Sequence, residues 1–357
     1  MTAAGAPTQM RREIYEQPAA VRRTLETLRP AIPHLRAAAR DCRQVLFIAR
    51  GSSDNAAVYG QYLCSVRAGR LGTLASPSVG TTYRAKVDLA GVLAVAVSQS
   101  GATEEIVETL DWARACGART VAVTNVAGSP LASAADLALV TQAGEERAVP
   151  ATKTYTTQLT ALAVLGLGLA HDDEALRELD AVPEAVEVAL SAAPAAQEMA
   201  DRLTYVDRLV VAARGYASST ALELALKLKE ACYVSASGLS YVDLLHGPIA
   251  VVDPTTPALL VAAADGPVLP GMASLAVRVA SLGAHVYGIG GNEAFAMACR
   301  SSLPGTGLPE YLAPIALIVP GQLLVEALAR AKGIDPDGPR GLRKVTQTDP
   351  GSQAASE

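Results

Sequence analysis

Gly91-Val92-Leu93-Ala94-Val95-Ala96-Val97 leads without a break into Ser98-Gln99-Ser100-Gly101-Ala102-Thr103, and a helical pattern begins at Glu104. The apolar run is long enough for a strand that is buried on both faces, as the strands of parallel sheets are. At a strand-to-helix turn, the first backbone N–H groups of the helix and the positive end of its dipole favour an anion. A helix cap needs one hydroxyl and this turn has three, so we expect an anion site here rather than an ordinary cap.

A second turn of the same kind follows the apolar run at residues 44–49. Arg50-Gly51-Ser52-Ser53-Asp54-Asn55 stands between that run and a helical pattern that opens at Ala56. In open α/β sheets, ligands bind beyond the carboxyl ends of the strands, where two such loops converge. Neither loop fits a nucleotide fingerprint, which needs more glycine or a Gly-Lys-Ser/Thr ending. We therefore expect a ligand such as a sugar phosphate.

Composition bounds the possible partners and the setting of the chain. The 357 residues suit two domains, and the net charge of −5 argues against broad binding to nucleic acid or anionic membrane. We expect no signal peptide after Met1 and no membrane span, since the longest apolar run, residues 159–170, is too short to cross a bilayer. Five cysteines and four histidines are scattered, which predicts no disulfide framework, no metal site and a cytoplasmic protein. No organic cofactor is expected either.

The pattern of strands and helices occurs twice. After a helical N-terminal segment, strands are predicted near residues 44–49, 91–97, 119–125 and 137–141, and again at 208–213, 258–263, 285–289 and 314–319. The first strand of each set ends in Ala-Arg-Gly, at residues 49–51 and 213–215. We predict an α/β fold with two tandem, doubly wound parallel sheets flanked by helices.

The predicted boundaries place the first unit at residues 1–182, the second at 183–331 and an extended C-terminal tail at 332–357. The last dozen residues are expected to be disordered. Where the first unit has its hydroxyl loop, the second reads Ala263-Ala264-Asp265-Gly266-Pro267. We therefore expect the phosphate to bind only in the first unit.

The helical stretch 221–232 carries a charged stripe. Glu223, Lys227 and Glu230 are spaced four and then three residues apart, so they fall on one face of a helix that is otherwise largely apolar. Such a stripe either faces water, which is the more common case, or lines a polar cavity. A single histidine such as His246 is likewise more often structural than catalytic.

Six motifs in order carry a resemblance to a known family. They are Glu13-Ile14-Tyr15-Glu16-Gln17-Pro18, the two hydroxyl loops, Val149-Pro150-Ala151-Thr152-Lys153 with residues 156–159, residues 225–230, His246-Gly247-Pro248, and Pro339-Arg340-x-Leu342-x-Lys344. With these motifs the chain resembles the double sugar-isomerase (SIS) domain family, in particular the isomerase half of glutamine–fructose-6-phosphate aminotransferases. The resemblance runs nearly from end to end.

The resemblance implies a role for each matching residue. It implies that Glu230 is the proton-transfer base, that His246 opens the sugar ring, and that Lys344 reaches the sugar carbonyl. It places Val149 and Thr152 beside the sugar, and a phosphate on a set of polar side chains: Ser52, Ser53, Ser98, Gln99, Ser100 and Thr103. It also implies a homodimer in which His246 of one chain reaches the sugar held by the other.

The residue types suit aldose–ketose interconversion. Histidine titrates near working pH and can move a proton between the ring oxygen and the anomeric hydroxyl. A carboxylate whose pKa burial raises toward neutrality can pass a proton between C1 and C2, and Glu230 is the candidate. Lys227 would stabilise negative charge on oxygen, and Lys344 could form an imine with the carbonyl or polarise it.

Two departures from the family pattern affect the predicted reaction. The family synthases begin with a glutaminase domain, whereas this sequence has no cysteine before Cys42, so we expect no ammonia from glutamine. Ala151 stands where those synthases have a serine. We therefore expect an amino-sugar-phosphate deaminase/isomerase that converts glucosamine 6-phosphate to fructose 6-phosphate and ammonia. The alternatives are a synthase supplied with ammonia directly or by a partner, a fructosamine-6-phosphate deglycase, and a non-catalytic sugar-phosphate sensor.

Overall fold

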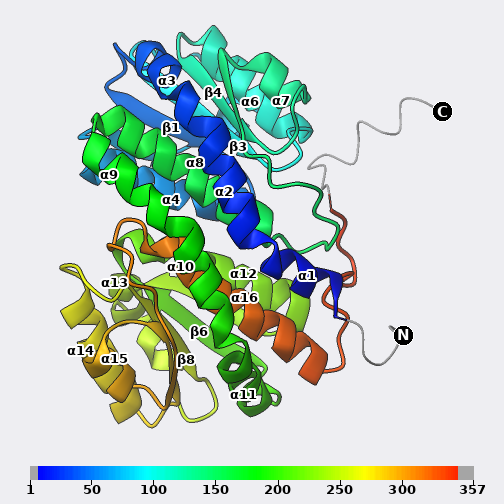
Figure 1. Ribbon diagram of the computed structural model, residues 1–357, viewed down its shortest axis with the longest axis vertical. Helices are drawn as coiled ribbons and strands as arrows, with labels where there is room; N and C mark the ends of the chain where they lie inside the picture. Colours follow the sequence, from blue (N-terminus) through cyan, green and yellow to red (C-terminus); the bar gives the residue numbers. More distant parts are fainter. Residues whose placement is uncertain (1–6, 345–357) are drawn as a thin grey trace.

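The computed structural model describes residues 7–344, and these form two parallel five-stranded sheets with helices on their faces (Figure 1). The strands of the first sheet are β1 (Gln44–Ile48), β2 (Leu71–Leu74), β3 (Val92–Ser98), β4 (Arg119–Thr124) and β5 (Leu137–Val140). Those of the second are β6 (Arg208–Ala213), β7 (Ser235–Ser240), β8 (Ala258–Ala262), β9 (Val286–Gly290) and β10 (Ser301–Leu303). This arrangement confirms the predicted fold class.

Helices cover both sheets and join the two halves. The first half carries α1 (Gln9–Tyr15), α2 (Gln17–Leu28), α3 (Ile32–Ala38), α4 (Ser52–Val66), α5 (Ser78–Thr81), α6 (Glu104–Ala115), α7 (Pro130–Ala134) and α8 (Lys153–Ala170). The remainder carries α9 (Asp173–Glu178), α10 (Val182–Ala189), α11 (Ala193–Leu203), α12 (Ser218–Cys232), α13 (Tyr241–Leu245), α14 (Leu269–Ser281), α15 (Glu293–Met297) and α16 (Ala313–Ala331).

The two sheets have the same topology. The first runs β2-β1-β3-β4-β5, and the second, read from its other edge, runs β7-β6-β8-β9-β10. In each sheet the second strand is therefore at one edge, beside the first, and the fifth is at the other edge. The chain reverses its direction of winding between the first and third strands, which is where ligands bind in such sheets. The repeat inferred from the Ala-Arg-Gly sequences is thus present in the fold.

The central strand β3 shows why the fold forms. All of its residues are buried, and their side chains alternate between the two faces of the sheet. Leu93, Val95 and Val97 join the core that contains α4 and α8, whereas Ala94 and Ala96 join the smaller core under α6. A strand covered on both faces needs an unbroken apolar run, as residues 91–97 provide.

One predicted strand is wrong. Residues 314–319 form the first turns of α16, and the fifth strand of the second sheet is instead the short β10. Beyond Val319 the sequence stays mostly apolar as far as Ala331, interrupted by Gln322, Glu326 and Arg330, and the 19 residues of α16 are a length typical of a helix. Periodicity alone does not separate a buried strand from a buried helix. Pro314 fits the first turn of α16, where the missing N–H has no helical partner to lose.

Helix α16 lies at the centre of the molecule. Within the described residues it is the helix whose length and composition would suffice to cross a membrane, but 94% of its most apolar window is buried inside the fold. It packs against α8 of the first half and against α10, α11 and α12. One apolar core therefore contains residues of both halves.

Beyond α16 the chain turns back toward the first half. Residues 334–344 contain no helix or strand and run along the edge of the molecule, coloured red in Figure 1, past α1. This course agrees with the extended tail expected from the sequence. The last dozen residues, for which disorder was expected, lie outside the described part of the chain.

Candidate functional site

A cavity of about 550 Å³ lies at the carboxyl ends of β1 and β3. It is lined by three groups of side chains, from the two hydroxyl turns, from the loop before α8 with α8 itself, and from α12 with the tail. Its lining comprises Arg50, Gly51, Ser52, Ser53, Val97, Ser98, Gln99, Ser100, Thr103, Ile106, Val149, Ala151, Thr154, Gln158, Lys227, Glu230, Leu342, Arg343 and Lys344. Most residues selected from the sequence therefore meet in one place, except Thr152 and His246.

The turn after β3 is fixed by its own hydroxyls. Ser98 Oγ accepts a hydrogen bond from Gly101 N at 3.3 Å, and Ser100 Oγ accepts one from Ala102 N at 3.2 Å. As acceptors, both hydroxyls keep their protons for donation to a ligand. Gly101 has φ +62°, and any Cβ there would overlap Ser129. Thr103 is the N-cap of α6 without a side-chain cap bond, so its hydroxyl is available to the cavity.

The turn after β1 is tied to its surroundings on two sides. Ser53 Oγ accepts a hydrogen bond from Gln158 Nε2 of α8 at 3.0 Å. The Arg50 guanidinium makes two hydrogen bonds of 2.9 Å to the Glu105 carboxylate in the first turn of α6. The two hydroxyl turns are thus held beside one another, and residues of both line the cavity.

Two members of the charged stripe of α12, Lys227 and Glu230, line this cavity, and the third, Glu223, is fully buried. The Lys227 side chain is only 2% exposed and pairs with Glu230 and, at 3.6 Å, with Glu223. Burial alone would lower the pKa of Lys227, but the two carboxylates raise it overall, so the residue stays an ammonium. Burial raises the pKa of the fully enclosed Glu223. Glu230 is the member nearest to solvent, with 22% of its side chain exposed at the cavity.

Sequence reasoning missed the buried carboxylate of Glu146. It accepts hydrogen bonds from Thr152 N at 2.9 Å, from Thr154 N at 3.0 Å and from Thr154 Oγ1 at 2.6 Å, and it pairs with Lys344 Nζ at 2.6 Å. Thr152 is completely buried and directed toward Glu146, which explains why it does not line the cavity. A carboxylate in an irregular loop has no periodic pattern that would separate Glu146 from its exposed neighbour Glu145.

The tail that carries Lys344 is attached at further points. The Asp337 carboxylate accepts hydrogen bonds of 2.7 Å from Gln9 N and Met10 N at the start of α1. The backbone carbonyl of Asp337 accepts one from Val149 N at 2.9 Å. Arg340 N donates to Tyr233 Oη at 2.9 Å, at the end of α12. The tail therefore contacts the N-terminal segment, the loop before α8 and the helix of Glu230.

The N-terminal motif at residues 13–18 supports the loop before α8. Glu13 is buried, and its carboxylate accepts a hydrogen bond from Arg147 N at 2.5 Å. Burial raises the pKa of Glu13. Gln17 donates to Gln322 Oε1 of α16 at 2.8 Å, and Gln322 in turn donates to Thr152 O at 3.2 Å. The motif at residues 13–18 thus acts on the position of the loop, without lining the cavity.

His246 lies apart from the cavity in the single chain. It follows α13 in the second half and is exposed. Among the described residues that line the cavity there is no histidine.

In the second half, a carboxylate lies between the two turns that correspond to the hydroxyl turns. A Cβ on Gly266 would overlap the Glu310 carboxylate, and one on Gly215 would lie 3.3 Å from Glu310 Oε1. Burial, together with the charge of Asp265, raises the pKa of Glu310. A negative charge at this position opposes the binding of an anion; that the phosphate binds only in the first half stays a prediction.

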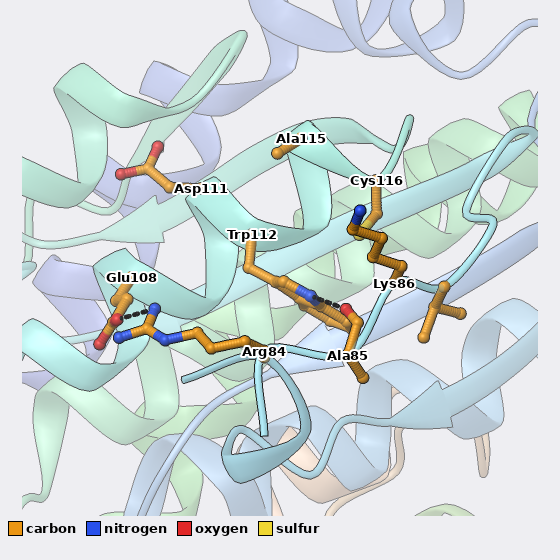
Figure 2. A pocket seen from close by; sticks show the side chains of 10 residues that line it. Arg84, Ala85, Lys86, Glu108, Asp111, Trp112, Ala115 and Cys116 are labelled. Atoms are coloured by element: carbon orange, nitrogen blue, oxygen red, sulfur yellow. Dashed lines mark hydrogen bonds and ion pairs between the residues drawn. The ribbon is translucent and has the colours of Figure 1, made fainter. Parts of the chain in front are cut away.

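A second cavity, of about 630 Å³, lies beside α6 and contains none of the predicted site residues (Figure 2). Two contacts join residues of its lining: Arg84 pairs with Glu108 at 2.5 Å, and Trp112 Nε1 donates to Ala85 O at 2.7 Å. Within residues 7–344, no group of three or more His, Cys, Asp or Glu side chains is placed to hold a metal ion.

Comparison with known proteins gives a consistent picture. The profile of the SIS domain matches residues 39–167. The chain is 36% identical over 350 residues to a glutamine–fructose-6-phosphate aminotransferase (isomerizing) of Thermococcus kodakarensis, with 96% of this chain and 58% of that one covered. A protein of the same name from Aeropyrum pernix is also 36% identical, over 96% of this chain and 57% of its own length. The chain therefore spans somewhat more than half the length of these relatives.

Solved structures cover the whole architecture. The C-terminal domain of glucosamine-fructose-6-phosphate aminotransferase from Francisella tularensis superposes with a TM-score of 0.85 at 28% identity, over 95% of this chain and 100% of that one. A protein described as a phosphosugar isomerase from Silicibacter pomeroyi gives 0.84 at 34% identity, over 93% and 100%. With its duplicated sheets and these relatives, the chain belongs to the SIS-domain family.

Proposed function

We propose that this chain isomerises an amino sugar phosphate, converting glucosamine 6-phosphate to fructose 6-phosphate with release of ammonia. One observation carries the proposal: two hydroxyl turns able to hold a phosphate share a single cavity with the Lys227–Glu230 pair and with Lys344. The cavity volume of about 550 Å³ suits a small ligand, and the lining offers both donors and a proton-transfer group.

Each group has a task in this reaction. Ser52, Ser53, Ser98, Gln99, Ser100 and Thr103 would hold the phosphate. Glu230 would take the proton from C2 of the open-chain sugar and return it at C1, while Lys227 stabilises negative charge on the oxygen at C1. The product of this transfer is an imine at C2. Water adds to that carbon and ammonia leaves, so glucosamine 6-phosphate plus water gives fructose 6-phosphate plus ammonia.

We further propose that the active form is a cytoplasmic homodimer in which His246 comes from the second chain. The cavity in one chain has no histidine among its described lining residues, whereas His246 is exposed and free to meet a neighbouring molecule. Ring opening needs a group that both donates and accepts a proton near neutral pH, and a histidine supplied in this way would provide it.

A second candidate is the reverse reaction, in which ammonia from a partner or from solution is added to fructose 6-phosphate. The names of the curated relatives, which are aminotransferases at 36% identity, favour it. The presence of Ala151 in the cavity, where the family synthases have a serine, favours deamination. The two reactions use the same side chains, so only their rates separate them.

The deciding experiment measures both directions on the purified chain. Fructose 6-phosphate and ammonia formed in equal amounts from glucosamine 6-phosphate would support the proposal. Faster formation of glucosamine 6-phosphate from fructose 6-phosphate, with added ammonium or with glutamine, would favour the synthase. Cleavage of a fructosamine 6-phosphate instead would indicate a deglycase, and tight binding of sugar phosphates without turnover a sensor.

A further inference from the structure

We propose that Glu146 is the positioning residue for Lys344: it holds the tail lysine at the cavity and couples the tail to the loop that forms the cavity wall. The inference rests on the proposed function for its catalytic consequence, but its structural part can be tested without any reaction. Glu146 itself does not line the cavity.

The two carboxylate oxygens of Glu146 have different partners. Oε1 accepts from the backbone N–H groups of Thr152 and Thr154, at 2.9 and 3.0 Å. Oε2 accepts hydrogen bonds from Lys344 Nζ and from Thr154 Oγ1, both at 2.6 Å. One oxygen therefore holds the turn that leads into α8, and the other holds the lysine. A single side chain thus links a wall of the cavity to a group that reaches into it.

Burial makes this link strong and specific. The Glu146 side chain has no exposed surface, whereas that of Lys344 is 24% exposed at the cavity. Burial by itself would raise the pKa of Glu146, but the Lys344 ammonium and the Thr154 hydrogen bonds lower it, so the carboxylate remains charged. A buried carboxylate without its cation would be costly, so the pair strongly favours the docked tail.

The remaining anchor of the lysine supports the same geometry. Lys344 Nζ also donates to Ala148 O at 2.8 Å, two residues after Glu146. The ammonium is thereby fixed by two acceptors of one loop rather than by a flexible surface contact. A catalytic group misplaced by about 1 Å can lower the rate on the order of 100-fold. A lysine on an irregular tail therefore needs a residue that fixes its position.

The substitution Glu146→Gln separates the two roles. A glutamine keeps one oxygen for the Thr152 and Thr154 N–H groups but presents an NH₂ group to the Lys344 ammonium. The matched control is Glu145→Gln, since the exposed Glu145 pairs only with Arg147 in the described structure. Glu146→Asp, which keeps the charge on a shorter side chain, serves as the conservative variant.

The first readout needs no activity. Trypsin cleaves after Arg340 and Arg343, so faster cleavage there measures release of the tail. We expect Glu146→Gln to be cleaved at least tenfold faster than the wild type, Glu145→Gln to match the wild type, and Glu146→Asp to lie between. A cleavage rate unchanged in Glu146→Gln would overturn the inference, whatever the enzyme does.

The second readout concerns the reaction. We expect kcat of Glu146→Gln to fall about 10- to 100-fold with KM changed less than threefold, because the phosphate turns are untouched. The double variant Glu146→Gln/Lys344→Met should be no slower than Lys344→Met alone, since Glu146 acts through the lysine. Fully additive losses would overturn this role. If the wild type turns over no amino sugar phosphate, the proposed function fails, while the cleavage result still decides the structural inference.

Discussion

Asn55 Nδ2 of α4 donates a hydrogen bond of 2.8 Å to Glu223 Oε2 of α12. Asn55 belongs to the hydroxyl turn after β1, and Glu223 lies one helical turn before Lys227. The bond therefore ties the hydroxyl turn of the first half to the helix of the proposed base in the second half. Because Glu223 is fully buried, the bond also satisfies an oxygen that water cannot reach.

Replacement of Asn55 by Ala should lower both stability and activity. A hydrogen bond to a charged group contributes about 1.5–3 kcal/mol, and its loss here leaves a buried carboxylate oxygen without a donor. We expect urea unfolding to show a loss of that size. Asn55→Asp should cost more, because it places a second carboxylate against Glu223. An Ala variant as stable as the wild type would contradict this account.

The hydroxyl turn after β3 should determine substrate affinity. Loss of each charge-assisted hydrogen bond to a phosphate should cost about 1.5–3 kcal/mol, so the double variant Ser98→Ala/Thr103→Ala should raise KM by at least 100-fold. Far-UV circular dichroism should be unchanged, because the apolar strand and α6 remain. A normal KM in the folded double variant would place the phosphate elsewhere.

Glu230→Gln should abolish proton transfer while leaving binding intact. The amide keeps the shape and a hydrogen bond to Lys227 but cannot accept a proton, so kcat should fall about 10²–10⁴-fold at nearly constant KM. In deuterium oxide, the wild type should incorporate deuterium at C1 of the product. Lys229→Gln, on the exposed side of the same helix, is the control. Normal exchange in Glu230→Gln would assign the base to another residue.

The origin of His246 can be tested by mixing inactive chains. We expect the His246→Ala chain to be inactive and the Ser98→Ala/Thr103→Ala chain to show almost no activity at substrate concentrations near the wild-type KM. At such concentrations their mixture should regain activity if one dimer site takes residues from both chains. Subunit exchange is verified with differently tagged chains and mass spectrometry. A mixture that exchanges but stays inactive would show that His246 serves its own chain.

The raised pKa of Glu310 in the second half predicts that the stability of the protein depends on pH. The pKa of Glu310 is raised in the fold, so its contribution to stability is present at low pH and is lost as pH rises through the folded pKa. Glu310→Gln should therefore raise Tm at pH 7, by about 1–3 °C, with the gain shrinking toward pH 4. The exposed Glu187→Gln is the control. An equal gain at both pH values would exclude a titration effect.

Much of the fold followed from the sequence because the central strands are buried on both faces. Such strands require unbroken apolar runs, which residues 44–49, 91–97 and 208–213 provide. The edge strands β2, β7 and β10 escaped prediction, since they are short or polar; β7 reads Ser-Ala-Ser-Gly-Leu-Ser. Residues 314–319 were assigned to a strand because a buried helix and a buried strand share the same composition.

Some residues of the candidate site could also be predicted from the sequence, and others could not. The hydroxyl turns and the α12 stripe could be found because strand ends and helix spacing place their residues at fixed positions. The role of Glu146, and the direction of the Thr152 side chain toward it, could not be predicted. Both depend on how an irregular loop contacts a tail almost 200 residues further along the chain. Contacts of that kind leave no local pattern in the sequence.

The central position of α16 has a consequence for how the molecule unfolds. The two sheets share one topology, yet this helix packs against elements of both halves. Neither copy retains a complete interior of its own, so cutting the gene between the halves should yield two insoluble fragments rather than two working modules. Heating the intact protein should accordingly give one calorimetric transition, because melting of either half removes the shared packing of the other.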